Sequence, residues 1–429
     1  MESLSVNAVL GLTGVIILVG LAGELILRRT GIPSVIFLLG FGILLGPVFH
    51  LAEPTVVMKL APYFGTLALL IILFDGGLRL HVMKVINETP LALFYSMTVF
   101  AMTVASIAVF YVSSMGGTWL HGLLLGSILG GTAAAIIMPL ISQMPALRDH
   151  AKVLVSLDSA FSEVFVVVIA LAIMGTMRGG SGTEVVVRDI FHAFWDALML
   201  AVLAGALWAR LLAWLEGQTL SYMITMAAIL VLYYVAEIIG ANGAITILLF
   251  GIVLSNMQYL VGRLARPIRT LIGYELDQAK FVLDAFLKRI NEELSFLVRT
   301  FFYVLLGLIL DFSSLTVGIA LTSLGLFVIV VGARWIITQL FGQLTHAWEP
   351  GEQLVIASMF PRGIATAVMA FLPTATGIPD TELFPVYALS VILLGVIGMT
   401  VILAVHQRWN PSAAHRAAPQ SAPSSSPAT

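Results

Sequence analysis

The sequence predicts an all-α polytopic membrane protein with about thirteen transmembrane helices. Hydrophobic residues make up 59% of the 429 residues and charged residues only 10%, and the mean hydropathy is +1.04. Apolar runs long enough to cross a bilayer recur along the chain. The cations between these runs gather in alternate connections. A soluble chain of this length would carry more charge and shorter apolar runs.

Glycine, proline and charged residues interrupt the apolar runs and mark the ends of the spans. In chain order the predicted spans are Val6–Leu27, Pro33–Phe49, Pro62–Leu80, Pro90–Val112, Thr118–Gln143, Ala151–Gly175, Phe191–Leu215, Leu220–Ile239, Gly243–Tyr259, Leu294–Leu310, Leu315–Leu340, Gln353–Leu372 and Leu383–His406.

Basic residues predict the orientation, because cytoplasmic connections are enriched in Lys and Arg. With the N-terminus outside, the external side holds only Lys59, Arg178 and Arg188. The cytoplasmic side then holds Arg28, Arg29, Arg79, Lys84, Arg148, Lys152, Arg210, Arg263, Arg266, Arg269, Lys280, Lys288, Arg289, Arg408 and Arg416. We therefore expect a plasma-membrane protein with an external N-terminus and a cytoplasmic C-terminus. No basic n-region precedes the first run, which is expected to remain as a span.

One membrane domain is expected, covering residues 1–408. Its longest connection, residues 261–293, is basic and amphipathic and is expected to lie along the cytoplasmic surface. Residues 409–429 are rich in Ala, Ser and Pro, which predicts a disordered tail. The formal net charge of −2 gives no indication of a nucleic-acid partner. The absence of cysteine excludes disulfides, thiolate metal sites and cysteine nucleophiles.

Weak internal similarity predicts that the chain is built from two halves. Phe41–Leu45 in the second span resembles Phe250–Leu254 in the ninth, about 210 residues later. Leu73–Leu78 in the third span is echoed by Val304–Ile309 in the tenth. Because the first and eighth spans start from opposite sides, the sequence predicts two inverted six-helix repeats. They cover roughly residues 6–176 and 219–406, and a helix at 191–215 links them.

Inverted repeats place a binding site where paired, interrupted helices meet near the middle of the membrane. Gly130 and Gly131 interrupt the fifth span, and Pro361 and Gly363 interrupt the twelfth at a similar depth. Such breaks free backbone groups, which protein or a water-filled cavity must satisfy. We expect the two broken helices to cross, as in a transporter. The alternative is that these are close-packing positions for small residues.

The sixth span carries Asp158 and Glu163 near its middle, where ionisable groups are costly and mark a pathway or a partner. Arg362 lies at a similar depth and is always charged. We expect Asp158 and Arg362 to form a structural ion pair and Glu163 to bind a cation or a proton. Further cation ligands would come from the hydroxyl oxygens of Ser159, Ser162 and Thr132. The alternative is that both acids are structural.

Other charged residues have simpler interpretations. Asp75 and Arg299 each lie about one turn from the cytoplasmic face, and we expect them to form a pair that is mainly structural. Glu24, Glu237 and Arg334 lie near span ends, where long side chains are expected to reach water.

Five motifs appear on these spans, in chain order: Phe74-Asp75-Gly76-Gly77-Leu78, Asp158-Ser159-x-x-Ser162-Glu163, Gly240-Ala241-Asn242-Gly243-Ala244-Ile245, Phe296–Phe302 and Pro361-Arg362-Gly363. Together they resemble the sodium/proton exchanger (NhaP-type) family of monovalent cation:proton antiporters, over nearly all of the chain up to about His406. The resemblance implies a homodimer without a cofactor that exchanges Na⁺, K⁺ or Li⁺ for H⁺ one for one. It also implies that Asp158 is the arginine-paired acid, Ser159 a ligand, Ser162 the counterpart of an asparagine, and Glu163 the ion-exchanging carboxylate.

The chain departs from the family pattern at two points. The acids of the sixth span are Asp then Glu, whereas the family has Glu then Asp. The family sequence Thr-Asp-Pro in the fifth span is Thr132-Ala133-Ala134 in this chain. An acid expected at the crossing is therefore absent, which leaves Glu163 as the carboxylate for the transported ion.

Three other classes of function have less support in the sequence. An enzyme is not expected, because the eight histidines lie at or near span ends or in loops and no HExxH motif occurs. A sodium-coupled solute symporter with similar repeats would use Arg362 to bind a substrate carboxylate. A cation channel is the third class, although a buried arginine would obstruct its pore.

Overall fold

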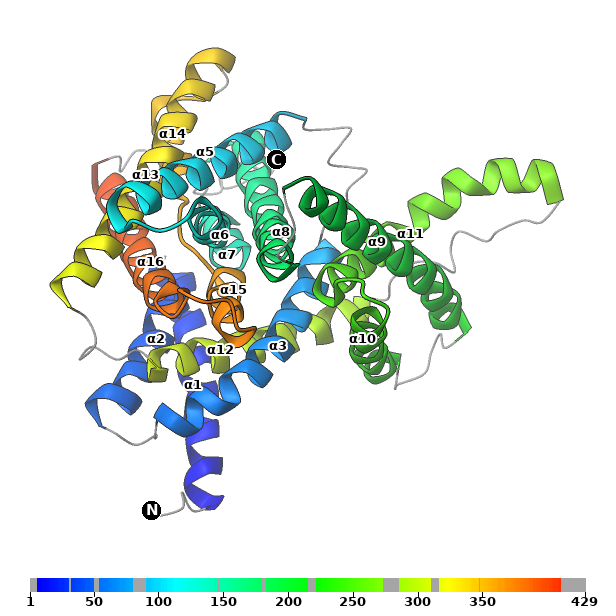
Figure 1. The fold of residues 1–429 in the computed structure, drawn as a ribbon, viewed down its shortest axis with the longest axis horizontal. Helices are drawn as coiled ribbons and strands as arrows, with labels where there is room; N and C mark the ends of the chain where they lie inside the picture. The colour runs from blue at the N-terminus through cyan, green and yellow to red at the C-terminus, as the bar shows by residue number, and fades with distance from the viewer. Residues whose placement is uncertain are drawn as a thin grey trace, which may run out of the picture.

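The computed structural model describes residues 6–30, 32–49, 54–79, 90–142, 144, 147–179, 183–214, 221–272, 285–309, 316–346 and 348–409, and in these residues it contains helices and no strands (Figure 1). The elements are α1 (Val6–Thr30), α2 (Ser34–Ile43), the π-helical turn η1 (Leu44–Val48), α3 (Pro54–Arg79), α5 (Pro90–Met115), α6 (Trp119–Leu129), α7 (Ala134–Ser142), α8 (Asp149–Gly179), α9 (Thr183–Trp214), α10 (Ser221–Ile238), α11 (Gly243–Ile272), α12 (Ala285–Ile309), α13 (Val317–Thr345), α14 (Pro350–Ser358), α15 (Ile364–Ala375) and α16 (Phe384–Trp409).

The prediction of an all-α polytopic membrane protein is confirmed, because each predicted span coincides with a helix or with a pair of helices. Six helices in the described part of the chain are long and apolar enough to cross a membrane. The fifth and twelfth predicted spans are each broken in two, as α6–α7 and as α14–α15. Within the predicted connection 261–293, α11 continues to Ile272 and α12 starts at Ala285. Residues 273–284 and the predicted tail beyond Trp409 lie outside the described residues.

The helices form two groups, which Figure 1 shows side by side. The crossing bundle consists of α5–α8 and α13–α16, which pack around the two broken helices. The flanking bundle consists of α1–α3 and α9–α12. The two bundles meet where α3 and α12 contact α15 and where α9 contacts α8.

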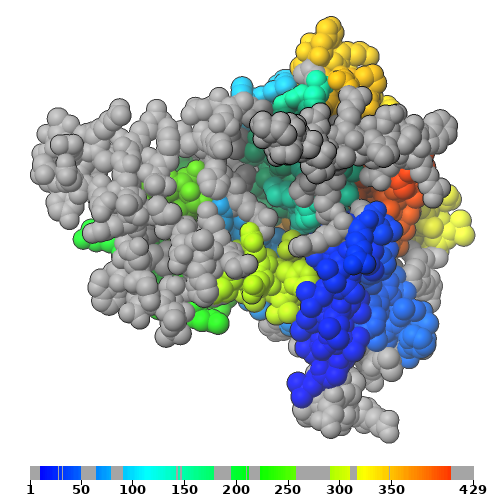
Figure 2. Space-filling view, turned by 180° about the vertical axis from the view of Figure 1, so that it is seen from behind, coloured from blue at the N-terminus to red at the C-terminus, as the bar shows by residue number. Residues whose placement is uncertain are grey.

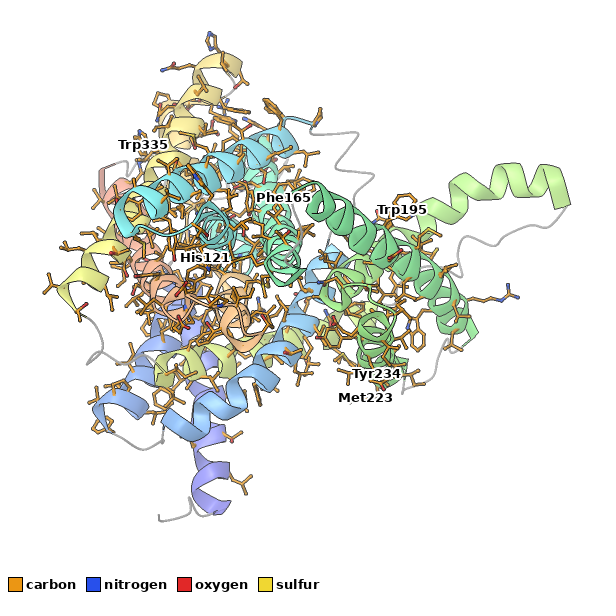
Figure 3. The ribbon with its side chains drawn as sticks, in the orientation of Figure 1. His121, Phe165, Trp195, Met223, Tyr234 and Trp335 are labelled. Atoms are coloured by element: carbon orange, nitrogen blue, oxygen red, sulfur yellow. The ribbon has the colours of Figure 1, made fainter. Side chains whose placement is uncertain are left out.

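The outer faces of the bundles are apolar, as lipid contact requires. Leu18 and Leu25 of α1 are exposed, and Figure 2 shows α1 on the surface beside the yellow-green α12. On the opposite side, Figure 3 shows Met223 and Tyr234 of α10 pointing away from the bundle, and both are about two-thirds exposed (66% and 64%). Such faces would be a liability in water but suit a bilayer.

Two close helix crossings hold the flanking bundle together, and both depend on glycine. A Cβ atom on Gly42 of α2 would lie 2.9 Å from the Cα of Gly307 of α12. A Cβ atom on Gly77 of α3 would lie 3.0 Å from the Cα of Gly251 of α11. Small residues let helix backbones approach closely in membranes, where van der Waals contact drives association. The two glycine pairs therefore set the spacing of α2 with α12 and of α3 with α11.

Candidate functional site

The two broken helices cross where their regular hydrogen bonding stops. The backbone N–H of Ala133 donates to the carbonyl oxygen of Pro361 over 2.9 Å, which joins the break of α6–α7 to that of α14–α15. Gly363 makes the contact possible, because a Cβ atom there would lie 2.8 Å from the Cβ atom of Ala133. Gly131 has the same role toward α8, since its Cβ atom would lie 2.9 Å from the carbonyl oxygen of Ser162. The predicted crossing is present.

Three successive amides at the start of α7 are bound by groups from neighbouring helices. The N–H of Thr132 donates to Ser162 Oγ over 3.0 Å, and that of Ala133 donates to Pro361 as described above. The N–H of Ala134 donates to Glu163 Oε1 over 3.1 Å. The first amides of a helix have no partner within it, so neighbours must satisfy them inside a membrane.

Glu163 therefore caps α7 with its carboxylate. A negative charge is favourable at a helix N-terminus, because the helix dipole is positive there. The family acid that is missing at Ala133 would lie at the same helix end, where the methyl group of Ala133 is fully buried against Gly363. The longer side chain of Glu163 reaches this helix end from α8.

Of the predicted hydroxyl ligands, two lie at the crossing. Thr132 Oγ1 and Ser162 Oγ are 2.8 Å apart and both residues are buried. The Ser159 hydroxyl donates to the carbonyl oxygen of Ser156 within α8, whereas the Ser162 hydroxyl combines a bond within α8, to the carbonyl oxygen of Ser159, with its contacts to Thr132. The structure thus brings Thr132, Ser162 and Glu163 together and binds the Ser159 hydroxyl to its own helix.

The expected ion pair between Asp158 and Arg362 is wrong, because Asp158 pairs with Arg334 of α13. Arg334 Nη2 lies 2.8 Å from Asp158 Oδ2, and both side chains are only 1% exposed. Arg334 Nε also donates to the carbonyl oxygen of Ile356 over 3.0 Å. The guanidinium carbon of Arg334 lies 5.8 Å from the ring centre of Tyr95, within the range of a cation–π contact.

The expectation that Arg334 reaches water is also wrong. Helix α13 continues to Thr345, past the predicted span end at Leu340, so Arg334 lies about three turns from the helix end. An arginine inside an apolar span needs a partner. This rule could have identified Arg334 from the sequence if the end of the span had been placed correctly.

Arg362 has a different contact. Its Nη1 donates to the carbonyl oxygen of Phe360 over 3.0 Å, and the residue is 1% exposed. Phe360 follows the C-terminus of α14, where the helix dipole is negative and attracts a cation. The charges of Asp158 and Arg334 both act on Arg362, so the three groups form one buried charged cluster.

Two cavities lie against the start of α7. The smaller has a volume of about 50 Å³, and Glu163, Asp75 and Arg299 all line it. The larger, of about 550 Å³, is lined by Glu24, Glu292, Glu293, Arg299 and Tyr303, among others. Ala134, Ala135, Met138 and Arg299 line both, which makes them a shared wall.

Asp75 and Arg299 thus line the same cavity as Glu163, which the sequence did not predict. Asp75 Oδ1 accepts a hydrogen bond from Asn291 Nδ2 over 2.8 Å, and Arg299 Nε donates to the carbonyl oxygen of Ser295 over 3.1 Å. Their predicted pairing stays a prediction. The described residues contain no group of three or more His, Cys, Asp or Glu side chains that could hold a metal ion. At the crossing itself, the Glu163 carboxylate binds the same helix end as the hydroxyl of Ser162, which contacts Thr132, and such hard oxygen donors suit an alkali cation.

Comparisons with known proteins show which family the chain belongs to. The sequence profile described as "Sodium/hydrogen exchanger, transmembrane" matches residues 14–406. The chain is 24% identical over 418 residues to the K(+)/H(+) antiporter NhaP of Alkalimonas amylolytica, covering 94% of this chain and 67% of that protein. It is 24% identical over 386 residues to the K(+)/H(+) antiporter NhaP2 of Shewanella sp. (strain MR-4), covering 86% of this chain and 61% of that protein.

Among solved structures, the fold is similar to that of the sodium proton antiporter MjNhaP1 from Methanocaldococcus jannaschii at pH 8. The TM-score is 0.71 at 19% sequence identity, with 94% of this chain and 98% of that chain covered. At this identity the likeness supports the fold, and the profile match over most of the chain supports the family. The chain is a multi-pass membrane protein that belongs to the sodium/hydrogen exchanger family.

Proposed function

We propose that this protein is a secondary active antiporter that exchanges a monovalent cation, Na⁺ or K⁺, for a proton by alternating access. The observation that carries the proposal is the position of Glu163. Its carboxylate caps α7 at the crossing and also lines a cavity beside the broken helices. A single carboxylate that takes either a cation or a proton exchanges one for the other, which makes the cycle electroneutral.

The crossing supplies the other groups that the exchange needs. Ser162 and Thr132 place two hydroxyl oxygens at the crossing, and Ser162 directly precedes Glu163 on α8. The amide of Ala134 stabilises the charged form of Glu163 when no cation is bound. Protonation weakens this contact and removes the charge that holds the cation, so proton binding favours cation release.

The predicted inverted repeats fit the two glycine crossings. If α2 corresponds to α11 and α3 to α12, the contact of α2 with α12 corresponds to the contact of α3 with α11. Gly42–Gly307 and Gly77–Gly251 occupy these two contacts. This pairing supports repeats at roughly 6–176 and 219–406, and the repeats support alternating access. A plasma-membrane location with an external N-terminus and a homodimeric state remain parts of the proposal.

Symport has less support. A symporter would need Arg362 to face a cavity where a substrate carboxylate could bind. Arg362 is 1% exposed, donates to Phe360 and lines neither cavity. The same buried arginine is unfavourable in a cation pore. The name of the relative from Alkalimonas amylolytica, a K(+)/H(+) antiporter, agrees with exchange.

Reconstitution in vesicles tests the proposal. Internal pH is followed after adding Na⁺, K⁺ or Li⁺ outside, with the wild type, Glu163→Gln and the control Asp149→Asn. Asp149 begins the same helix but is exposed. We expect cation-driven proton movement in the wild type and the control, and a loss of at least about a hundredfold in Glu163→Gln. Full exchange in Glu163→Gln would refute the assignment.

A further inference from the structure

The smaller cavity lies between the two bundles. Its lining residues come from α7, α8 and α15 of the crossing bundle and from α3, α11 and α12 of the flanking bundle. Helices α3 and α12 pack against α15 at this boundary (Figure 1). Three of the lining residues carry charge: Glu163 of the crossing bundle, and Asp75 and Arg299 of the flanking bundle. The exchange carboxylate therefore shares its cavity with one negative and one positive group of the other bundle.

Helix α12 holds both of these charges on the flanking bundle. Asn291 Nδ2 donates to Asp75 Oδ1 over 2.8 Å, and Arg299 Nε donates to the carbonyl oxygen of Ser295 over 3.1 Å. Asn291 and Ser295 lie one turn apart, and both are almost fully buried. Hydrogen bonds to buried groups restrict the side chains that they hold. Asp75 and Arg299 are thus fixed charges of their own bundle.

The cavity is small enough for each charge to act on a cation at Glu163. Its volume of about 50 Å³ has room for only a few water molecules, and Glu163 and Arg299 are only partly buried. At a separation of about 10 Å and an effective dielectric constant of about 20, one unit charge changes the binding of another by about an order of magnitude. Arg299 repels a cation at Glu163, whereas Asp75 attracts it.

We propose that Arg299 and Asp75 are two opposing charges that together set the affinity of Glu163 for the transported cation. This inference rests on the proposed antiport function. Arg299 weakens binding, so that the ion can leave, and Asp75 limits this effect, so that the ion can still enter. Asp75 thereby supplies a second negative charge beside the exchange site, where Ala133 replaces the family acid.

Neutralising the two residues separately tests the proposal, because their effects have opposite signs. The KM for Na⁺ or K⁺ is measured in the vesicle assay at alkaline pH, where protons compete least. Arg299→Gln should lower this KM about three- to tenfold, and Asp75→Asn should raise it about three- to tenfold. The double variant removes one charge of each sign and should return to within about threefold of the wild type.

Two further measurements report on the same charges. The Na⁺ or K⁺ concentration that protects the detergent-solubilised protein against heat does not depend on transport, and it should change in the same order as KM. Protons compete for the same carboxylate, so the pH profile of exchange should move about half to one unit higher in Arg299→Gln and lower in Asp75→Asn. The variants leave in place the other charged groups described above, which are Glu24, Glu292 and Glu293 of the larger cavity and the cluster of Asp158, Arg334 and Arg362.

Two variants separate charge from packing. Arg299→Lys keeps the positive charge and should keep KM within about twofold of the wild type. A KM in Arg299→Lys that matches that of Arg299→Gln would count against an effect of charge. Lys152→Gln is the matched control, because it removes a positive charge from α8 at a residue that lines neither cavity, and its KM should not change. A purely structural role would lower the unfolding temperature without opposite shifts in KM.

The inference and the proposed function can fail separately. If Arg299→Gln and Asp75→Asn move KM in the same direction, or if neither moves it more than twofold, while Glu163→Gln abolishes exchange, the role of the two charges is refuted and the antiport assignment stands. If Glu163→Gln exchanges normally, the proposed function itself fails.

Discussion

The buried pair of Asp158 and Arg334 gives the sharpest test of the structure. The sequence led us to expect Arg362 as the partner of Asp158, whereas Arg334 occupies that position at 2.8 Å. The two possibilities differ in which arginine is energetically coupled to Asp158 in a double-mutant cycle. We therefore consider Asp158→Asn, Arg334→Gln and Arg362→Gln, each alone, and each arginine variant combined with Asp158→Asn.

The expected magnitudes follow from burial. Removing one partner of a buried ion pair costs about 3–5 kcal/mol, because the other charge stays buried without compensation. Asp158→Asn also leaves Arg334 and Arg362 to repel each other, so we expect a loss of about 5 kcal/mol. Arg334→Gln leaves Asp158 within the field of Arg362, and we expect about 3 kcal/mol. The double variant Asp158→Asn/Arg334→Gln leaves neither member of the pair as an unpaired buried charge. Its free energy of unfolding should fall by no more than about 5 kcal/mol.

These values give a coupling free energy of about 3 kcal/mol between Asp158 and Arg334. The same cycle with Arg362→Gln should give a smaller coupling, of about 1–2 kcal/mol, because removing Arg362 relieves the repulsion that Asp158→Asn leaves behind. Unfolding of the purified protein in mixed micelles, followed by tryptophan fluorescence over a range of denaturing detergent, measures all six free energies of unfolding. A larger coupling between Asp158 and Arg362 than between Asp158 and Arg334 would refute the pairing.

Two further predictions concern packing and pH. Gly42→Ala places a Cβ atom against the carbonyl oxygen of Val304 in α12 and should lower the free energy of unfolding by about 1–3 kcal/mol. Gly40→Ala meets nothing within 4 Å and should be neutral in the same unfolding assay. Burial raises the pKa of Glu352, but hydrogen bonds and the charge from Arg148 outweigh it, and the pKa falls below its usual value of 4.5. The stabilisation is therefore complete above about pH 4.5 and is lost as the pH falls through the lowered pKa. Glu352→Gln should remove this acid-side loss in unfolding scans against pH, whereas Glu349→Gln, at a side chain that is 74% exposed, should retain it.

Much of the fold could be predicted because the bilayer imposes local rules. A span must be apolar over the thickness of the hydrocarbon, so each helix leaves a continuous signal in the sequence. The breaks at Gly130–Gly131 and at Pro361–Gly363 are local as well, since glycine and proline weaken a helix wherever they occur. The cost of burying Asp158 and Glu163 marked α8 as the helix that carries the site.

The partners of these groups could not be predicted in the same way. The choice of Arg334 over Arg362 depends on how α8, α13 and the break before α15 are rotated and set in depth against one another. Hydropathy locates span ends only to within a few residues, and an error of one turn moves a side chain by about 5 Å. That distance decides whether an ion pair forms.

The sequence alone therefore determined that the chain lies in a membrane, the order of its helices, the two interruptions and the positions of the two acids in α8. Each of these depends on residues that are neighbours in the chain. Only the tertiary structure decided that Arg334 neutralises Asp158, that Glu163 caps α7, and that Arg299 of α12 lines both cavities. These contacts join residues from different helices, and hydrogen bonds and ion pairs need atoms placed to within a fraction of an ångström. Packing of the whole bundle sets those positions.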